Sequence, residues 1–284
     1  DKAVTLDAGF RRDVKHIDHS ATAAKALSAN SDVDMAPSKI FTLGARWEIR
    51  KDLAMNARYF DGNEGTSGNF DLVTKNKAPL HAMKQKRSEF AVEYEPWSFL
   101  RGALTLFDVD IRNLKSATTD TYLVNGDSYY YYTESDSRQK GVELAFKGAF
   151  KSGLDYGLTW THMLKNQTKQ SGATSDLLGA SSPKDSYILR LGYRWNQYRF
   201  NASLKHVSGW GQSQSAMGMA SGVDLGSYTR VDVNASRDFD LGGNPLSVKL
   251  YVRNLGNDKY ATRYTTGYYY DRGLTVGVET TAKF

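Results

Sequence analysis

The stretch "YILRLGYRWNQYRFNASLKH", which runs from Tyr187 to His206, alternates apolar and polar residues on both sides of a short polar break. Before the break, one face is apolar and consists of Tyr187, Leu189, Leu191, Tyr193 and Trp195. After the break, the apolar positions are Phe200, Ala202 and Leu204. A period of two residues is typical of a β-strand with one apolar face, and Asn196-Gln197 suits a tight turn. The stretch therefore predicts a β-hairpin, whose polar face contains Arg190, Arg194 and Lys205.

The same alternation recurs along the whole chain. Twelve segments show it, at residues 4–13, 40–50, 53–59, 90–94, 99–113, 141–150, 154–164, 187–195, 200–206, 229–236, 246–254 and 274–284. In segment 99–113 the sequence leaves open which residues form the apolar face. Apolar residues at helical spacing are not sustained anywhere, so we predict an all-β fold with twelve strands.

The composition limits what such a sheet can be. The 284 residues include no cysteine, have a mean hydropathy of -0.54 and carry a net charge of +6. No apolar run is long enough for a transmembrane helix, but a transmembrane β-barrel needs none because its strands alternate lipid-facing and lumen-facing residues. The lack of cysteine excludes disulfides and thiolate metal sites. The sequence has no basic cluster with interleaved aromatic residues, the pattern that would indicate a nucleic-acid partner.

The connections between the predicted strands alternate between short and long. Short turns are expected at Lys51-Asp52, Pro96-Trp97, Lys151–Gly153, Asn196-Gln197 and Leu241–Pro245. Long polar loops are expected at residues 18–38, 62–86, 114–134, 165–183, 210–226 and 257–268. Outer-membrane barrels have this asymmetry, with short periplasmic turns and long extracellular loops.

The two faces of the predicted strands differ in chemistry. One face carries charged residues on most strands, such as Arg46, Glu93 and Lys249, which suits a polar lumen. The other face is apolar, with tryptophan and tyrosine near strand ends, where aromatic girdles lie: Trp47, Tyr59, Tyr94, Trp160, Tyr187 and Trp195. We therefore predict an antiparallel transmembrane β-barrel in the outer membrane, with a soluble β-sandwich as the alternative.

Several motifs together resemble one family. The ending "NLGNDKYATRYTTGYYYDRGLTVGVETTAKF", from Asn254 to Phe284, is similar to the C-terminus of TonB-dependent outer-membrane receptors. Upstream, "RSEFAVEY" at 87–94, "SRQKGVELAFKG" at 137–148 and "SYTRVDVNASRDF" at 227–239 resemble strands of the same family. The resemblance covers essentially the whole chain, and the order and spacing of the motifs carry it.

The resemblance implies a barrel larger than this chain can form. The family barrel has twenty-two strands and a plugged lumen. Residues 1–284 are therefore expected to be the C-terminal portion of such a barrel, with the signal peptide, TonB box, plug and N-terminal strands absent from this sequence. Phe284 shares the apolar face of the last segment, and a terminal aromatic residue there resembles the signal that the barrel assembly machinery reads.

The resemblance also implies a function. The expected role is TonB-dependent uptake of a bulky iron chelate, with a ferric siderophore as first choice and haem as second. The expected partners are this chelate, the TonB complex acting through the absent plug, outer-membrane lipid and the assembly machinery. No nucleophile signature appears, so no enzyme and no cofactor are predicted. The alternative is a stand-alone twelve-stranded channel for passive diffusion, with the lumen charges as its selectivity path.

Two tyrosine-rich segments are the candidate ligand site. Segment 114–134 offers Tyr129 and Tyr131, and the last long loop offers Arg263, Tyr264, Tyr268, Tyr270 and Arg272. Aromatic rings with arginine suit a flat, anionic, aromatic iron chelate through stacking and charge pairing. The alternative is an aromatic girdle or a hairpin projecting above the membrane, with rings paired across strands.

The five histidines are weaker candidates. His16, His19 and His81 could each reach haem iron from a loop, although a solvated loop histidine is the simpler interpretation. His162 and His206 share the apolar face and are expected at the membrane interface. No set of histidine and carboxylate residues has the spacing of a metal site.

Overall fold

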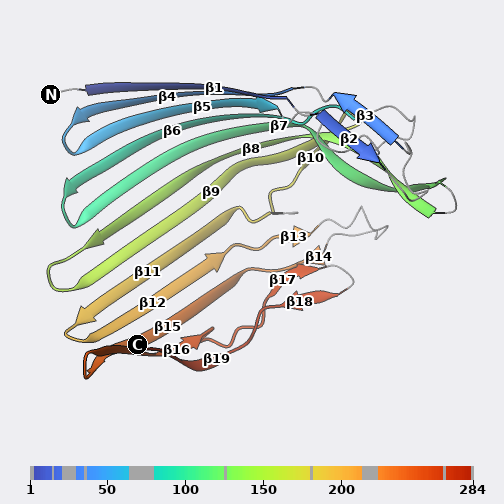
Figure 1. Cartoon of the computed structure of the whole chain (residues 1–284). Helices are drawn as coiled ribbons and strands as arrows, with labels where there is room; N and C mark the ends of the chain where they lie inside the picture. Colours follow the sequence, from blue (N-terminus) through green and yellow to red (C-terminus); the bar gives the residue numbers. More distant parts are fainter. Residues whose placement is uncertain are drawn as a thin grey trace.

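The computed structural model describes residues 3–14, 16–20, 30–34, 37–63, 80–124, 127–179, 182–212, 223–264 and 267–282. All regular structure in these ranges is β (Figure 1). The described residues contain no helix long and apolar enough to cross a membrane.

Twelve strands form one continuous antiparallel sheet. In order they are β1 (Ala3–Asp13), β4 (Ser38–Arg50), β5 (Leu53–Asn63), β6 (Lys84–Trp97), β7 (Leu100–Val124), β8 (Asp127–Ala149), β9 (Leu154–Gln170), β11 (Asp185–Trp195), β12 (Tyr198–Val207), β15 (Tyr228–Leu241), β16 (Asn244–Arg253) and β19 (Thr275–Ala282). Each strand pairs with the next one in this order. The predicted all-β fold and its twelve strands are confirmed.

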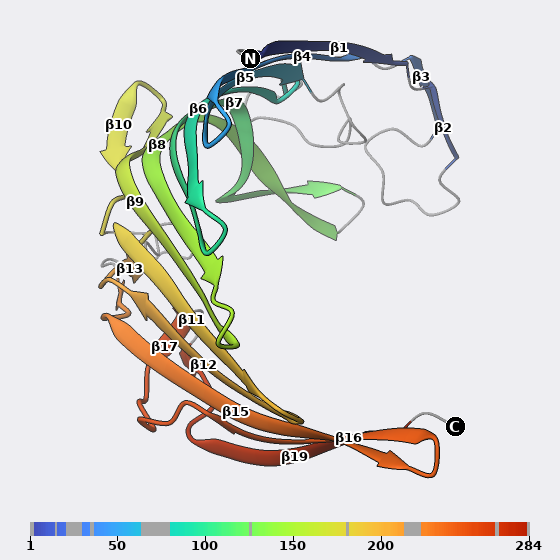
Figure 2. The ribbon, with the colours of Figure 1, turned by 90° about the vertical axis from the view of Figure 1, so that its left-hand side faces the viewer.

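The sheet curls into an open arc. Figure 2 shows the arc from β1 at one edge to β19 at the other, with the two edges apart. Within the described ranges, these two strands do not pair with each other. The structure is therefore a partial barrel.

The register settles which face of segment 99–113 is apolar. Leu104 lies opposite Val92 on β6 and Leu144 on β8, and Leu106 lies opposite Phe90 and Val142. Leu104 and Leu106 are 42% and 47% exposed, although each sits in the middle of an apolar row. Apolar rows that a protein neither buries nor covers are typical of a lipid-facing surface.

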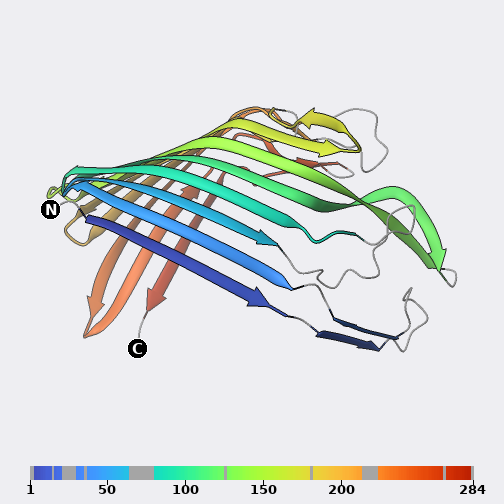
Figure 3. The ribbon, with the colours of Figure 1, turned by 90° about the horizontal axis from the view of Figure 1, so that it is seen from above.

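The tight turns all lie at one end of the sheet (Figures 1 and 3). The predicted turns at 51–52, 151–153, 196–197 and 241–245 are present there. The prediction at Pro96-Trp97 is wrong by two residues, because β6 continues to Trp97 and the turn is Ser98-Phe99. A register shift between Tyr94 and Trp97 causes the difference, since a β-bulge adds a residue that alternation does not reveal.

An aromatic row lines part of this end. Neighbouring rings along it are Trp97 and Phe99 with centroids 5.4 Å apart, Phe99 and Phe150 at 5.3 Å, and Phe150 and Tyr156 at 5.9 Å. The Tyr156 hydroxyl donates to the Phe99 carbonyl oxygen at 3.1 Å. This row occupies the place of a membrane-interface girdle.

Gly148 lets the residues of this aromatic row pack closely, because it has no side chain. A Cβ at Gly148 would lie 1.7 Å from the Phe99 carbonyl oxygen, whereas a Cβ at Gly157 would meet its nearest atom at 3.9 Å. We expect Gly148→Ala to destabilise the folded barrel by about 1–3 kcal/mol through overpacking, and the matched Gly157→Ala to have little effect. The temperature at which the folded band unfolds on electrophoresis measures this, and equal temperatures for both variants would contradict it.

The long connections lie at the opposite end and contain short strand pairs (Figure 1). These are β2 (His16–Ser20) with β3 (Asn30–Asp34), β10 (Ala173–Asp176) on β9, β13 (Gly211–Gln212) with β14 (Val223–Asp224), and β17 (Ala261–Tyr264) with β18 (Tyr268–Tyr270). Long excursions at one end and tight turns at the other match the predicted asymmetry.

The prediction of a loop at 114–134 is wrong, because these residues belong to two strands. β7 and β8 are 25 and 23 residues long and stay paired up to Val124 opposite Asp127. Threonine and tyrosine favour strands, so this polar segment continues the ladder instead of leaving it. Register shifts between Ile111 and Leu114 and between Ala117 and Thr121 interrupt the pairing, and the hairpin bends across the open end of the arc (Figure 2). A hairpin was one of the alternatives that the sequence left open for this tyrosine-rich segment, and the strand register shows one.

Candidate functional site

Two tyrosine-rich hairpins lie at the end of the sheet opposite the tight turns (Figure 1). The β7–β8 extension comprises the described residues of 114–134, and the terminal hairpin comprises those of 261–270. Together they contain every tyrosine predicted to bind a ligand. The topology therefore brings the two predicted segments to the same end of the sheet.

Within the β7–β8 extension, the tyrosine run alternates between faces. Tyr129 lies opposite Tyr122, and Tyr130 opposite Thr121. The Tyr130 residue is 56% exposed, whereas the ring of Tyr131 lies 4.7 Å from the ring of Tyr122. Tyr131 thus makes the cross-strand ring contact that the sequence left open as an alternative to ligand binding.

The terminal hairpin presents a row of tyrosines. Tyr264 and Tyr268 meet edge to face with centroids 5.0 Å apart, and Tyr268 lies 5.9 Å from Tyr270. Tyr268 and Tyr270 are 47% and 62% exposed, so broad ring surfaces face outward. Arg263 pairs with Tyr269 in the strand register, and Arg272 follows the hairpin as an exposed residue. Phe284 lies outside the described residues, so its role stays a prediction.

Asn254 anchors the base of this hairpin. It is the most buried polar residue described, at 1% exposed, and it adopts a left-handed φ of 52°. Its side-chain amide donates to the carbonyl oxygens of Asp258 and Arg272 at 3.0 and 3.1 Å, and its Oδ1 accepts from the Asp258 N–H at 3.1 Å. One side chain therefore joins the two chain segments that flank the hairpin.

A charged cluster ties the same hairpin to β15. Arg230 donates to Asp232 through Nε and to Asp271 through Nη1, both at 2.8 Å. The Tyr260 hydroxyl also donates to Asp271, and the Tyr260 ring stacks on Tyr228 with centroids 4.0 Å apart. Hydrogen bonds to ionised groups are stronger than neutral ones, so this cluster holds the hairpin in one position. The sequence analysis did not single out Arg230 or Asp271, and it used Asn254 and Tyr260 only as parts of a family motif.

The cluster shifts the ionisation of its members. Burial, followed by the Asp271 carboxylate, raises the pKa of the Tyr260 hydroxyl to about 12. The hydrogen bond from Tyr260 in turn holds the pKa of Asp271 below its usual range. A lowered carboxyl pKa stabilises the folded hairpin at neutral pH, and this contribution is lost as pH falls through the folded-state pKa.

Tyr260 is expected to titrate late. The folded state retains its proton up to about pH 12, whereas an unperturbed tyrosine loses it near about pH 10. The stability that Tyr260 contributes is therefore present below about pH 10 and lost as pH rises toward 12. Ultraviolet titration of the wild type minus Tyr260→Phe isolates this one tyrosinate, and a difference signal centred near pH 10 would contradict the prediction.

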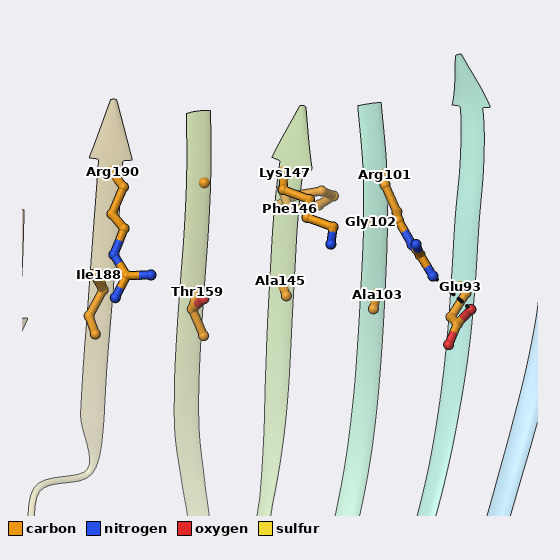
Figure 4. A pocket seen from close by; sticks show the side chains of 11 residues that line it. Glu93, Arg101, Gly102, Ala103, Ala145, Phe146, Lys147, Thr159, Ile188 and Arg190 are labelled. Atoms are coloured by element: carbon orange, nitrogen blue, oxygen red, sulfur yellow. Dashed lines mark ion pairs between the residues drawn. The ribbon is translucent and has the colours of Figure 1, made fainter. Parts of the chain in front are cut away.

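The polar face carries a second feature, a hollow of about 470 Å³ that spans β6 to β11 (Figure 4). Arg101, Lys147 and Arg190 line it, together with Glu93. Glu93 accepts from Arg46 at 3.0 Å and from Asn56 at 3.0 Å, and it lies 3.6 Å from Arg101. This part of the wall is thus cationic around one carboxylate that several donors share.

The described histidines have protein partners. His81 Nδ1 lies 2.9 Å from Glu134 Oε2 in the β7–β8 extension. His162 contacts Asp185 at 2.7 Å, and His206 stacks on Tyr187 and contacts Thr229 at 2.8 Å. His162 and His206 lie on the apolar face, opposite Val142 and Tyr187, and their place at the membrane interface stays a prediction. His16 and His19 pair within β2 and β3, and their side chains lie outside the described part.

Comparison with known proteins decides the family. Residues 1–255 match the family described as TonB dependent receptor-like, beta-barrel. The chain belongs to the TonB-dependent receptor family. Members are outer-membrane receptors and transporters, not enzymes. A sequence search among curated proteins finds no match.

Solved structures of several transporters share the fold. The copper transporter OprC superposes with a TM-score of 0.73 at 12% identity, over 98% of this chain and 45% of its own. The unliganded ferric citrate transporter FecA gives 0.71 at 14%, over 99% and 43%. The FrpB iron transporter from Neisseria meningitidis gives 0.71 at 16%, over 99% and 43%. This TonB-dependent receptor chain thus spans less than half the length of these proteins.

Proposed function

We propose that residues 1–284 form the C-terminal part of an outer-membrane receptor for TonB-dependent uptake of a bulky iron chelate. The observation that carries the proposal is the terminal hairpin, where exposed tyrosines are held at the end opposite the tight turns by Asn254, Arg230 and Asp271. Stacking on flat aromatic ligands needs rings that are both accessible and fixed in place. This hairpin has both properties.

A ferric siderophore is the preferred ligand class. Two of the structural neighbours named above are iron transporters by name, which supports iron without identifying the chelate. Haem is second, because the Nδ1 atom of His81, the described loop histidine, already has Glu134 Oε2 as a partner at 2.9 Å. Tyr129, Tyr131, Arg263, Tyr264, Tyr268, Tyr270 and Arg272 remain the proposed contacts.

The proposed partners follow from the proposed receptor function. A plug upstream of this chain would meet the cationic hollow on the polar face and link the receptor to the TonB complex. Phe284 would present the assembly signal to the barrel assembly machinery. The alternative of a stand-alone channel has less support, because β1 and β19 are separate edges and the sheet is open.

The proposal predicts a loss of ligand binding when the tyrosine row is removed. In the intact receptor, Tyr268→Ala with Tyr270→Ala should weaken binding of its ferric chelate roughly ten- to hundred-fold, because two stacking surfaces are lost. Arg272→Gln should weaken it further if the chelate is anionic. Binding and uptake of radio-iron-labelled catecholate and hydroxamate chelates, and of haemin, measure the effect under iron limitation.

Tyr269→Ala is the matched control. It removes the same side chain from the same strand, but from the position that alternates with Tyr268 and Tyr270. Heat-modifiable migration confirms that each variant has assembled. If the double variant assembles and transports every tested chelate as well as the control does, the terminal hairpin is not part of the binding site.

A further inference from the structure

The polar face of β11 and β12 carries cations and no carboxylate. On β11 this face consists of Ser186, Ile188, Arg190, Gly192 and Arg194, and on β12 of Arg199, Asn201, Ser203, Lys205 and Val207. In register from the long connections toward the tight turns, the cations are Lys205, then Arg190, then Arg194 and Arg199 side by side. All four residues are exposed. We name these four residues the cation row.

The register places like charges directly opposite each other at both ends of the cation row. Arg194 lies opposite Arg199, and Lys205 lies opposite Arg230 on β15. Like charges at directly opposite positions destabilise a sheet. Arg230 has carboxylate partners, as described above, whereas Arg194 and Arg199 make no ion pair with any described residue. The wall therefore retains positive charge that it does not neutralise itself.

Elsewhere on the polar face, cations lie beside acids. Arg87 forms an ion pair with Glu89 on β6. Lys249 on β16 pairs with Glu279 on β19 at 3.1 Å. A pair of this kind leaves little net charge facing the lumen. The cation row differs because its charges are exposed and because its own two strands supply no acid to this face.

The acids on the bordering strands do not balance the cation row. Asp155 on β9 and Asp238 on β15 make no ion pair with any described residue. Asp232 on β15 is already engaged in the cluster that holds the terminal hairpin. Arg101 and Lys147, which line the hollow, add further positive charge on β7 and β8. The polar face from β7 to β12 is therefore net positive.

The cation row connects the two ends of the wall. It begins beside Arg230, which donates to Asp271 at 2.8 Å and so holds the terminal hairpin. It ends at Arg194 and Arg199, next to the tight turn between β11 and β12 (Figure 1). Between these ends, Arg190 borders the hollow, as Figure 4 shows. The row thus leads from the candidate ligand site to the end with the tight turns.

We infer that the cation row is a transit path for an anionic cargo along the lumen wall. Lysine and arginine select anions in pores, and passage needs several weak sites instead of one tight site. A surface lined by one sign of charge also raises the local concentration of ions of the opposite sign. The inference rests on the proposed function and deepens it: the transported chelate is anionic, and it moves along β11 and β12 after it leaves the terminal hairpin.

An acidic surface of the plug is the other occupant that these charges would suit. A fixed partner would be matched by cations gathered at one level of the wall. The four cations are instead spread over successive levels of two strands, from Lys205 to Arg199. Separate steps suit an anion that moves, because no single position holds it.

Uptake kinetics test the inference. Arg194→Gln with Arg199→Gln removes the last step of the cation row, at the end opposite the terminal hairpin and outside the lining of the hollow. Cells that carry the intact receptor are given radio-iron-labelled anionic catecholate and carboxylate chelates and a neutral hydroxamate chelate. We expect the maximal uptake rate of the anionic chelate to fall at least about five-fold in this variant, because the charge that attracts it is lost. The dissociation constant for binding to de-energised cells should stay unchanged.

Two comparisons separate transit from general effects of charge or folding. Arg194→Lys with Arg199→Lys keeps the charge and should transport at the wild-type rate. Arg87→Gln with Lys249→Gln removes two cations that have acid partners on the same face, and it should also leave the rate unchanged. Heat-modifiable migration confirms that each variant has assembled.

Four results would each overturn the inference. They are an unchanged rate in the glutamine variant, an equal loss in the lysine variant, an equal loss in the Arg87–Lys249 control, and wild-type uptake of the neutral chelate alone. Entry of a large antibiotic such as vancomycin into cells with the glutamine variant would also overturn it, because the row would then be holding the plug in place. Failure of the proposed function is distinct, since the wild type would then bind none of the chelates.

Discussion

Leu189→Arg is expected to prevent assembly of the barrel in the membrane. Leu189 lies on β11 between Leu158 on β9 and Leu204 on β12, in the middle of the apolar face. An arginine at the bilayer midplane on the lipid face of a barrel costs about 2–4 kcal/mol. The loss should appear as little folded protein in outer-membrane fractions, measured by heat-modifiable migration.

Ser203→Arg is the matched control for this prediction. Ser203 is adjacent to Leu204 in β12 but points to the polar face, opposite Arg190 and Asp232. It adds the same side chain to the neighbouring strand, on the side where charge is accepted. If both arginine variants assemble equally well, the assignment of the two faces is wrong.

Asn254→Ala is expected to release the terminal hairpin while the wall stays folded. The variant removes all three hydrogen bonds of a side chain that is 1% exposed and leaves the Asp258 N–H without its partner. An unsatisfied buried group costs about 1–3 kcal/mol. Amide protection over residues 255–272 should fall by about ten-fold or more, and chelate affinity should fall with it because the rings are no longer held in place.

The control for Asn254 is Asn201→Ala. Asn201 donates to Asn234 at 2.8 Å within the wall, so it also loses a side-chain hydrogen bond, but far from the hairpin. Its hairpin protection should match wild type. A barrel in which Asn254→Ala leaves both protection and affinity unchanged would show that the tyrosine row needs no anchor.

The wall of the barrel was predictable because alternation encodes it directly. A strand in lipid must present one apolar face, and residues such as Leu189 and Leu191 record that requirement at every second position. Alternation fails to predict the structure where the two-residue period is broken. The bulge after Tyr94 shifts the turn to Ser98-Phe99. The polar β7–β8 extension has no apolar face, so alternation predicts a loop there although its residues favour strands.

The anchor of the terminal hairpin could not be predicted in the same way. Arg230 and Asp271 are 41 residues apart in sequence, and Asn254 meets the Arg272 carbonyl 18 residues away. Such contacts depend on how β15, β16 and the segment after β16 come together in space. No local sequence pattern predicts that arrangement. The tyrosines themselves were visible as a run, but which ring is paired and which is exposed depends on the register of the hairpins.

The opposite ends of this sheet differ in how freely their sequences can change over evolutionary time. At the end that carries Trp97, Phe99 and Phe150, a turn of a few residues joins each pair of strands, so an inserted residue would shift the register of the wall. At the other end, connections leave the main ladder before they return, so a change in length there leaves the wall intact. The long connections can therefore vary in length while the strands of the wall keep their register.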